Sequence, residues 1–476
     1  MRKASLVGAL FVLVGLVLVL LPAGGSAATA QLAAIPTNID VSQRLGNESE
    51  EAIAVNPTNP NNIVVFTNIQ EGVSGLFLGV SFDGGQTWTR RIVADGPSIG
   101  QGAGGLGDGC CDPSVAFDHY GNLFLSYLYN AENVVPVLLS TDGGQTLQLL
   151  TNIQKPDKPK GTKGGERHGE YRFVDQETIV TGDSSVWLVF NGGGPMVATG
   201  APVSGLGDVG DFIPNEVIPG TNNCTYGDVA VGPGGKVMNV CTLTETGQGG
   251  GKVFVNIDPD GLGPALFGSR VLVASTHVGG FNFIPAQAER SVDAEPGLAW
   301  DRTGGPHNGR VYVVYSLEEK NGSNDLNIYV RHSDDDGATW SAPLRVNDDT
   351  GANSQFMPKI ALDPTDGHLA VVWYDARNDL GTGGAGDTNG IPNDDAQFWS
   401  AFSSDGGASF SPNQQISAGT SNSHVSGNGI DFGDYSGLSF YCGLAYPSWS
   451  DNSNSTGTNP DGMLKKLDIY TAAVAG

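Results

Sequence analysis

The stretch Ser81-Phe82-Asp83-Gly84-Gly85-Gln86-Thr87-Trp88 is an Asp-rich turn that the chain repeats. The pattern Ser-x-Asp-x-Gly-x-Thr-Trp, with conservative changes, occurs again at 140–147, 333–340 and 403–410. In such a turn the Asp side chain folds back onto turn amides, Gly supplies a positive φ, and the aromatic residue packs between neighbouring sheets. Four copies at equivalent places indicate a fold built from one repeated unit.

An apolar strand pattern accompanies these turns and recurs seven times. The copies lie at 51–57, 112–118, 177–183, 228–233, 295–301, 357–363 and 434–439. A second, nearly continuous apolar run follows most copies after a Gly or Asn turn, as at 62–66 and 368–373, which is typical of a strand buried on both faces. A third strand then runs into the Asp-rich turn and a fourth follows it.

Four strands per unit and seven units predict an all-β chain folded as a β-propeller of seven four-stranded blades. Six blades with one irregular insertion is the alternative. The seventh unit ends at its third strand, 467–471, and the segment 37–42 offers a spare strand before the first unit. We therefore predict that this N-terminal strand completes the seventh sheet and closes the ring without an open edge.

The turn motif resembles the Asp-box, or BNR, repeat of the sialidase-like superfamily, and the resemblance extends blade by blade over nearly all of the chain after residue 30. It implies that the box residues Asp83, Asp142, Asp335 and Asp405 are structural and lie on the face opposite the active site. The active face would carry the loops that lead into the innermost strands and those that join second to third strands.

The resemblance also implies a substrate site for an exo-acting glycoside hydrolase on extracellular glycans. Sialidases hold the substrate carboxylate with three arginines, and Arg172, Arg290 and Arg377 are the candidates. Forked guanidinium groups match a carboxylate geometrically. Salt bridges with neighbouring acids are the alternative role for these arginines.

The catalytic residues that the resemblance implies are a Tyr nucleophile, a Glu partner and an Asp acid or base. The candidates are Tyr435 (or Tyr226), Glu295 and Asp112. The first unit lacks the family's Arg-Ile-Pro motif and holds the acidic stretch 48–51 there. A non-catalytic propeller that binds a glycan or protein on the same rim is therefore the alternative, with the repeated acids capping loop amides.

The chain is strongly acidic, with a formal net charge of −26. Because no basic patch offers counterion release, the composition argues against nucleic-acid binding. Asp375 and Asp379 begin a long Gly-rich loop with further acids at 387, 394 and 395. Carboxylates and loop carbonyls are the ligands that Ca²⁺ takes, so Ca²⁺ is a candidate cofactor there, and a solvated insertion is the alternative. We expect a monomer whose partner is an extracellular glycan or protein.

The N-terminus has the pattern of a signal peptide. Arg2 and Lys3 precede a continuous apolar run at 6–21, and Ala28-Thr29-Ala30 is a cleavage-site pattern. We predict a signal peptide at 1–30 and a single propeller domain at 31–476, secreted to the extracellular space or periplasm. An uncleaved anchor is the alternative, and no other stretch is apolar enough to cross a membrane.

Export permits disulfides, and the five cysteines make an odd set. Cys224 and Cys241 flank the hairpin around 232–235 and are predicted to form a bond across it. The adjacent Cys110 and Cys111 form a vicinal disulfide, two separate buried thiols or a bridge elsewhere. Cys442 is the candidate for the unpaired thiol.

Overall fold

The structure is a computed structural model, and it divides the chain into Met1–Ala34 and Ile35–Gly476. It describes residues 1, 34–70, 74–96, 106–129, 134–154, 174–244 and 248–476. The predicted signal peptide lies outside the described residues except for Met1. The account below concerns Ile35–Gly476.

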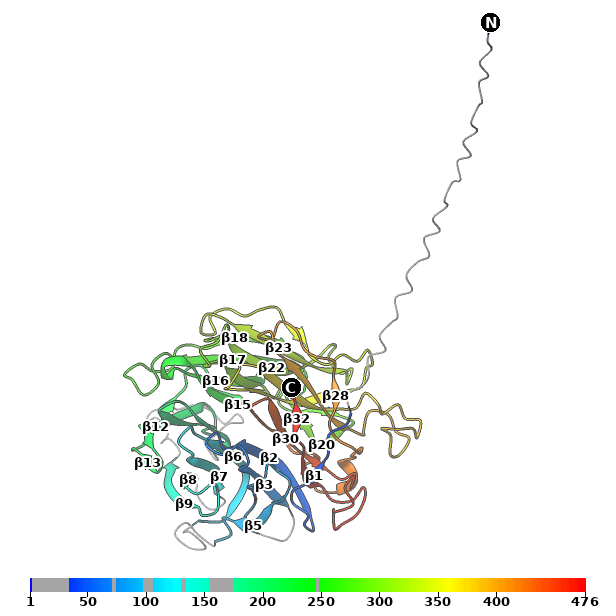
Figure 1. Ribbon diagram of the computed structural model, residues 1–476, viewed down its shortest axis with the longest axis horizontal. Coiled ribbons are helices and arrows are strands. Elements are labelled where there is room, and N and C mark those ends of the chain that lie inside the picture. The colour runs from blue at the N-terminus through cyan, green and yellow to red at the C-terminus, as the bar shows by residue number, and fades with distance from the viewer. Residues whose placement is uncertain (2–33, 71–73, 97–105, 130–133, 155–173, 245–247) are drawn as a thin grey trace, which may run out of the picture. The chain divides into compact units, whose positions relative to one another are not determined.

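The first four sheets follow one another along the chain (Figure 1). Blade 1 contains β2 (Asn47–Val55), β3 (Ile63–Gln70), β4 (Leu76–Ser81) and β5 (Thr89–Val93). Blade 2 contains β6 (Gly109–Phe117), β7 (Leu123–Tyr129), β8 (Val134–Ser140) and β9 (Gln148–Gln154). Blade 3 contains β10 (Asp175–Thr181), β11 (Ser185–Asn191), β12 (Met196–Gly205), β13 (Asp208–Val209) and β14 (Glu216–Val217). Blade 4 contains β15 (Cys224–Val231), β16 (Val237–Thr244), β17 (Gly251–Asp258) and β18 (Val271–Thr276).

Three further sheets complete the set after a separate hairpin, β19 (Asn282–Ile284) and β20 (Gln287–Val292), which the sequence did not predict. Blade 5 contains β21 (Gly297–Trp300), β22 (Val311–Glu318), β23 (Leu326–Ser333) and β24 (Leu344–Arg345). Blade 6 contains β25 (Gln355–Leu362), β26 (Leu369–Asp375), β27 (Gln397–Ser403) and β28 (Gln414–Gln415). Blade 7 contains β29 (Gly437–Tyr441), β30 (Leu444–Asp451), β31 (Asp468–Thr471), β32 (Val474–Ala475) and, from the other end of the chain, β1 (Ile39–Asp40). The described helices are the 3₁₀ turns η2 (Pro233–Gly235) and η3 (His424–Ser426).

The innermost strands of the seven sheets form a closed ring. Each contacts the innermost strand of the next blade, in the order β2, β6, β10, β15, β21, β25, β29 and back to β2. This confirms the seven-bladed propeller, and the six-bladed alternative is wrong.

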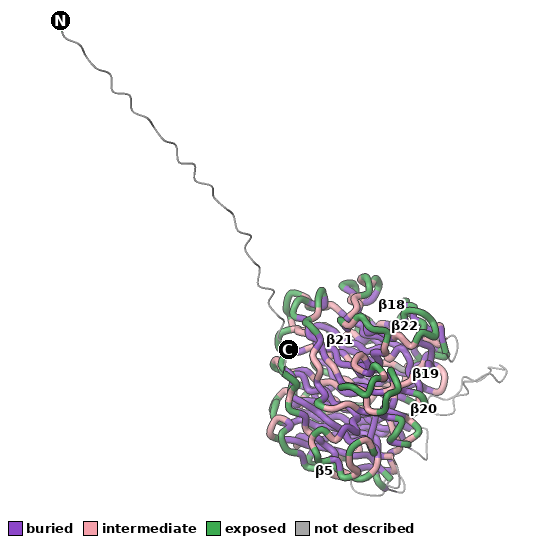
Figure 2. The backbone as a smooth tube through the Cα atoms, turned by 90° about the vertical axis from the view of Figure 1, so that its right-hand side faces the viewer, coloured by how far each residue is buried: buried purple, intermediate pink, exposed green. Residues whose placement is uncertain are grey.

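The hydrophobic core lies between adjacent blades. The second strands β3, β7, β11 and β26 are buried along almost their whole length, as the apolar runs predicted. One typical layer packs Phe66 and Leu78 of blade 1 against Leu125 and Leu138 of blade 2. Figure 2 shows the buried backbone filling the interior, with exposed residues concentrated in the connections. Burying side chains of this size contributes about 1.5–3 kcal/mol each, so these layers hold the blades together.

The ring closes as predicted, through a strand supplied by the N-terminal segment. In β1, Ile39 lies opposite Thr471 and Asp40 opposite Tyr470 of β31. The amide of Val41 donates to the carbonyl of Ile469 at 2.7 Å, which extends the pairing beyond the two residues of the strand.

The four Asp-rich turns share one hydrogen-bond pattern. In the turn between β4 and β5, Ser81 Oγ donates to Asp83 Oδ1 at 2.8 Å, and the amide and hydroxyl of Thr87 donate to Asp83 at 2.9 and 2.6 Å. The turns around Asp142, Asp335 and Asp405 repeat these bonds. The bonds from Thr87 lower the pKa of Asp83 to about 2. Each box carboxylate is thus engaged within its own turn.

The described residues contain two disulfides, Cys224–Cys241 as predicted and the vicinal Cys110–Cys111. A bulge between Thr225 and Gly227 places Cys224 opposite Leu243 instead of directly opposite Cys241. The Cys224–Cys241 disulfide therefore runs diagonally across the hairpin, with a Cα–Cα distance of 5.7 Å. Cys442 is an exposed free thiol. Within the described ranges, we find no helix of the length and apolarity needed to cross a bilayer.

Candidate functional site

A residue with a left-handed backbone conformation (positive φ) recurs near the start of the innermost strands. Glu50, Asp112, Gln176, Glu295 and Met357 have φ values of 58°, 51°, 46°, 39° and 52°. In four of these five blades the register between the first and second strands shifts at this residue, which therefore forms a β-bulge. A bulge changes the direction in which the neighbouring side chains point. Positive φ is costly for residues other than Gly and clusters at functional sites. The repeated bulge marks one end of the ring as a candidate site.

A cavity of about 210 Å³ lies next to these bulges and is lined by residues from or beside all seven innermost strands. Its ionisable lining residues are Glu51, Glu177, Asp228, Glu295, Lys359 and Tyr435. The Asp-box turns lie at the other end of the blades, because Asn62, in the turn after β2, donates to the carbonyl of Gly143 in the second box at 3.0 Å. The predicted separation of box face and ligand face therefore fits the geometry.

Eight acidic residues near this cavity influence one another electrostatically, and we call them the rim carboxyls. They are Glu50, Asp112, Asp175, Glu177, Asp228, Asp293, Glu295 and Asp434. Burial and, to a smaller extent, the charge of Asp434 raise the pKa of Glu50 to about 8. Burial also raises the pKa of Glu295 to about 8, although Lys359 opposes the rise. Glu50 and Glu295 therefore hold a proton at neutral pH.

The rim carboxyls differ in how their oxygens are satisfied. Asp112 Oδ2 accepts the amide of Gln176 at 2.8 Å. Asp228 Oδ2 accepts the amide of Leu298 at 2.9 Å and lies 3.5 Å from the Nζ of Lys359. Glu177 is 4% exposed, and neither of its oxygens has a hydrogen-bond partner among the described atoms. Glu177 is thus the group in the cavity with the greatest unmet hydrogen-bonding capacity.

Tyr435 lies in the cavity wall beside these acids. Burial raises its pKa well above the usual value, and the charges of Asp112 and Glu50 add to the rise. Among the described residues no hydrogen bond joins Tyr435 to Glu295. Tyr435 and Glu295 thus line one cavity, and Asp112 lies close enough to Tyr435 to act on its phenol electrostatically.

The two predicted arginines that the structure describes have carboxylate partners of their own. Arg172 lies outside the described residues. Arg290 binds Asp434 with both its Nε, at 2.7 Å, and its Nη2. Arg377 donates to Asp375 at 2.9 Å and to Asp348 at 2.7 Å, and stacks 4.2 Å above the Trp399 ring. Neither Arg290 nor Arg377 lines the cavity.

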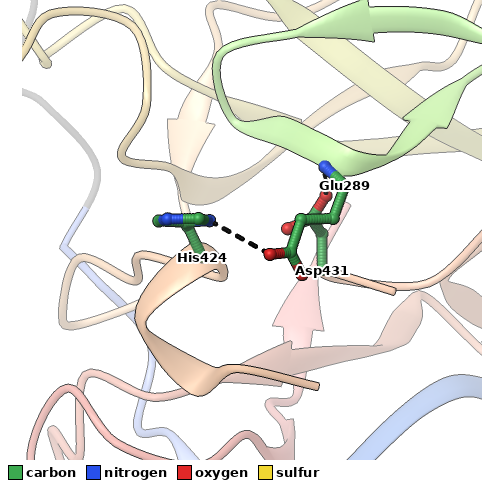
Figure 3. Close-up of side chains that lie close together, drawn as sticks. All are labelled: Glu289, His424 and Asp431. Carbon is green, nitrogen blue, oxygen red and sulfur yellow. Dashed lines mark hydrogen bonds and ion pairs between the residues drawn. The ribbon is translucent and has the colours of Figure 1, made fainter. Parts of the chain in front are cut away.

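The unpredicted hairpin β19–β20 positions Arg290. Asp431 accepts the amides of Glu289 and Arg290 at 2.8 and 2.9 Å. His424 Nδ1 lies 3.6 Å from a carboxylate oxygen of Glu289, and Figure 3 shows Glu289, His424 and Asp431 gathered at this junction. Both Asp431 oxygens have hydrogen-bond partners, so this group fastens the hairpin to the segment before β29.

The structure places the two predicted metal ligands in different environments. Asp375 binds Arg377 and, through Oδ2, the indole nitrogen of Trp373 at 2.7 Å. Asp379 instead lies with Asp394 and Asp395, and one oxygen from each falls within 4.8 Å of the others. Sequence spacing alone did not distinguish the ion pair from the acidic cluster.

The bulge was not predicted, although the sequence contains a signal for it. In each repeat that has one, the bulge residue lies six positions before the Asn, Asp or Gly that directly follows the innermost strand. Examples are Glu50 before Asn56 and Asp112 before Asp118. Aligning the repeats on that residue places Glu50, Asp112 and Glu295 at one equivalent position.

Comparison with protein-family models and with curated proteins gives no match. Solved structures with a similar fold include the phage phi92 endosialidase, at 11% identity over 92% of this chain and 69% of that chain, with a TM-score of 0.47. They also include the polysaccharide lyase Uly1 (11%, 87% and 88%, 0.46) and the Penicillium chrysogenum alpha-L-arabinanase (12%, 76% and 92%, 0.42). Likeness at this level does not identify a reaction.

Proposed function

We propose that this protein is an exported glycoside hydrolase that cleaves extracellular glycans with carboxyl groups at the rim cavity. The observation that carries the proposal is the set of buried carboxyls with raised pKa values around a cavity at one end of the ring. Strongly perturbed acids in a concave site are typical of catalytic centres. The two disulfides support export to an oxidising compartment.

Glu295 and Asp228 are the pair that we assign to the reaction. Both line the cavity, and the charge of Asp228 is one cause of the raised pKa of Glu295. With a pKa of about 8, Glu295 holds a proton at neutral pH and is suited to protonate the leaving oxygen of the glycosidic bond. Asp228 lies 3.5 Å from the Lys359 ammonium and accepts the amide of Leu298, and these contacts hold its carboxylate in place as the base or nucleophile.

The charge of the rim favours a neutral or cationic sugar over a sialic acid. Among the described residues, the eight rim carboxyls outnumber the nearby cations, Arg290 and Lys359, and each of these cations already contacts a carboxylate. In the described part of the rim, a substrate carboxylate would meet an excess of acidic groups, and the Arg290 guanidinium is already paired with Asp434. We therefore place the protonated phenol of Tyr435 as a hydrogen-bond donor to sugar oxygens, in preference to a nucleophile.

The test is release of reducing ends from neutral, amino-sugar and sialylated oligosaccharides by the wild type and three variants. Glu295→Gln and Asp228→Asn are expected to lose at least 100-fold in rate on the preferred substrate while retaining binding. Asp183→Asn, an exposed acid outside the cavity, is the matched control and should retain full activity. Wild-type binding without cleavage would support the non-catalytic propeller instead, and cleavage of sialosides alone would contradict the charge argument.

A further inference from the structure

The connection between β26 and β27 gathers three carboxylates in a small space. Asp379, Asp394 and Asp395 each place a carboxylate oxygen within 4.8 Å of the other two. Asp379 and Asp395 are completely buried, and Asp394 is partly buried. Within the described part of the chain no Lys, Arg or His forms an ion pair with any of the three. Three like charges at this separation repel one another strongly in a buried setting.

Two oxygens of this cluster are buried without a hydrogen-bond donor. Asp379 Oδ2 accepts the amides of Asp394 and Asp395 at 2.7 and 2.9 Å, which fixes the carboxylate. Asp379 Oδ1 and Asp394 Oδ1 have no partner among the described atoms. A buried carboxylate oxygen that has lost water and gained no donor is costly. The unpartnered Oδ1 of the fully buried Asp379 is therefore suited to bind a cation.

We propose that Asp379, Asp394 and Asp395 bind a Ca²⁺ ion. The donors are all oxygens, which suits a hard cation and disfavours Zn²⁺ or Cu²⁺, whose protein sites use His or Cys. Ca²⁺ accepts six to eight oxygens in flexible geometry, and a loop of this length can add carbonyls or water to three carboxylates. The strict octahedron of Mg²⁺ is harder to satisfy in a preformed cluster.

The ion would tie the two ends of one connection together. Asp379 lies just after β26, and Asp394 and Asp395 lie just before β27, so a bound ion would span the base of the Gly-rich segment between them. The site is separate from the carboxyls assigned to glycan cleavage and does not depend on that assignment.

Calorimetric titration of the EDTA-treated protein with CaCl₂, paired with thermal unfolding, tests the site. The wild type is expected to bind Ca²⁺ saturably and to melt at a higher temperature when Ca²⁺ is present. Asp379→Asn and Asp394→Asn should each weaken binding at least tenfold and lose most of the Ca²⁺-dependent rise. Asp387→Asn is the matched control, because Asp387 lies in the same loop but bonds only to loop amides.

No saturable binding by the wild type would overturn the proposal, as would equal binding by the wild type and both cluster variants. Equal loss in Asp387→Asn would also overturn it, since the effect would then reflect surface charge. Because Asp394 is only partly buried, its variant can be compared even if Asp379→Asn fails to fold. Titration with MgCl₂ should give at least tenfold weaker binding, and stronger Mg²⁺ than Ca²⁺ binding would contradict the assignment.

Discussion

Replacing Glu48 by Gln should stabilise the protein at alkaline pH and leave its stability at acidic pH almost unchanged. Glu48 lies in β2 at the ring closure, completely buried, with one oxygen contacting Arg44 and the other unpartnered. Burial raises its pKa from 4.5 to about 8, with Arg44 opposing the rise and Asp40 adding to it. The ionised form is therefore disfavoured in the folded state.

The sign and size follow from proton linkage. Between pH 4.5 and about 8 the unfolded chain ionises this group while the folded chain keeps the proton, so stability falls as pH rises through this window. A pKa difference of about 3.5 corresponds, at about 1.4 kcal/mol per unit, to about 5 kcal/mol above pH 8. Gln has nearly the same shape and carries no charge, so the variant avoids this cost.

The assay is urea denaturation of wild type and Glu48→Gln at pH 4 and pH 9. The difference in unfolding free energy should be near zero at pH 4 and reach several kcal/mol in favour of the variant at pH 9. All other ionisable groups are shared by the two proteins, so their contributions cancel to first order. A difference that is the same at both pH values, or a less stable variant at pH 9, would refute the reasoning.

Four other changes test different parts of the structure. Ile469→Ala removes a completely buried side chain beside the closing strand and should lower the unfolding free energy by about 2–5 kcal/mol, measured by urea denaturation. Asp335→Ala deletes the acceptor of three hydrogen bonds in one box turn and should lower the melting temperature while leaving glycan cleavage intact. Cys442→Ser should abolish reaction of the folded protein with a thiol reagent and leave stability unchanged, and residual reaction would mean that a disulfide is open. Cleavage by the wild type should decline above about pH 8 as Glu295 ionises, and a rate that rises there would contradict its role as acid.

The blade architecture could be predicted because its signals are local. The hydrogen bonds that fix each box turn lie within seven consecutive residues, as between Ser81 and Thr87. The sequence motif therefore predicts the turn without reference to the rest of the chain. The closing strand could be predicted because the seventh unit has only three strands and the segment 37–42 offers a fourth. The hairpin β19–β20 could not be predicted because its strands are short. In addition, the apolar Phe283 is exposed, so the sequence does not alternate between buried apolar and exposed polar residues there.

The site was less predictable because its properties depend on packing between distant segments. Arg290 had the right residue type, but its pairing with Asp434 joins positions that are 144 residues apart. Asp375 and Asp379 are close in sequence, yet one faces Arg377 and the other faces acids that follow a long loop. The residue types that occupy the rim are visible in the sequence, whereas their partners are decided by the fold.

The shared sheet of blade 7 also constrains when the molecule can form. Residues 39–40 are made some 430 residues before their partner β31, so the ring stays open until β31 has been synthesised. Until the last strands arrive, a protease would meet an incomplete ring, and a product truncated before β31 would lack the closure.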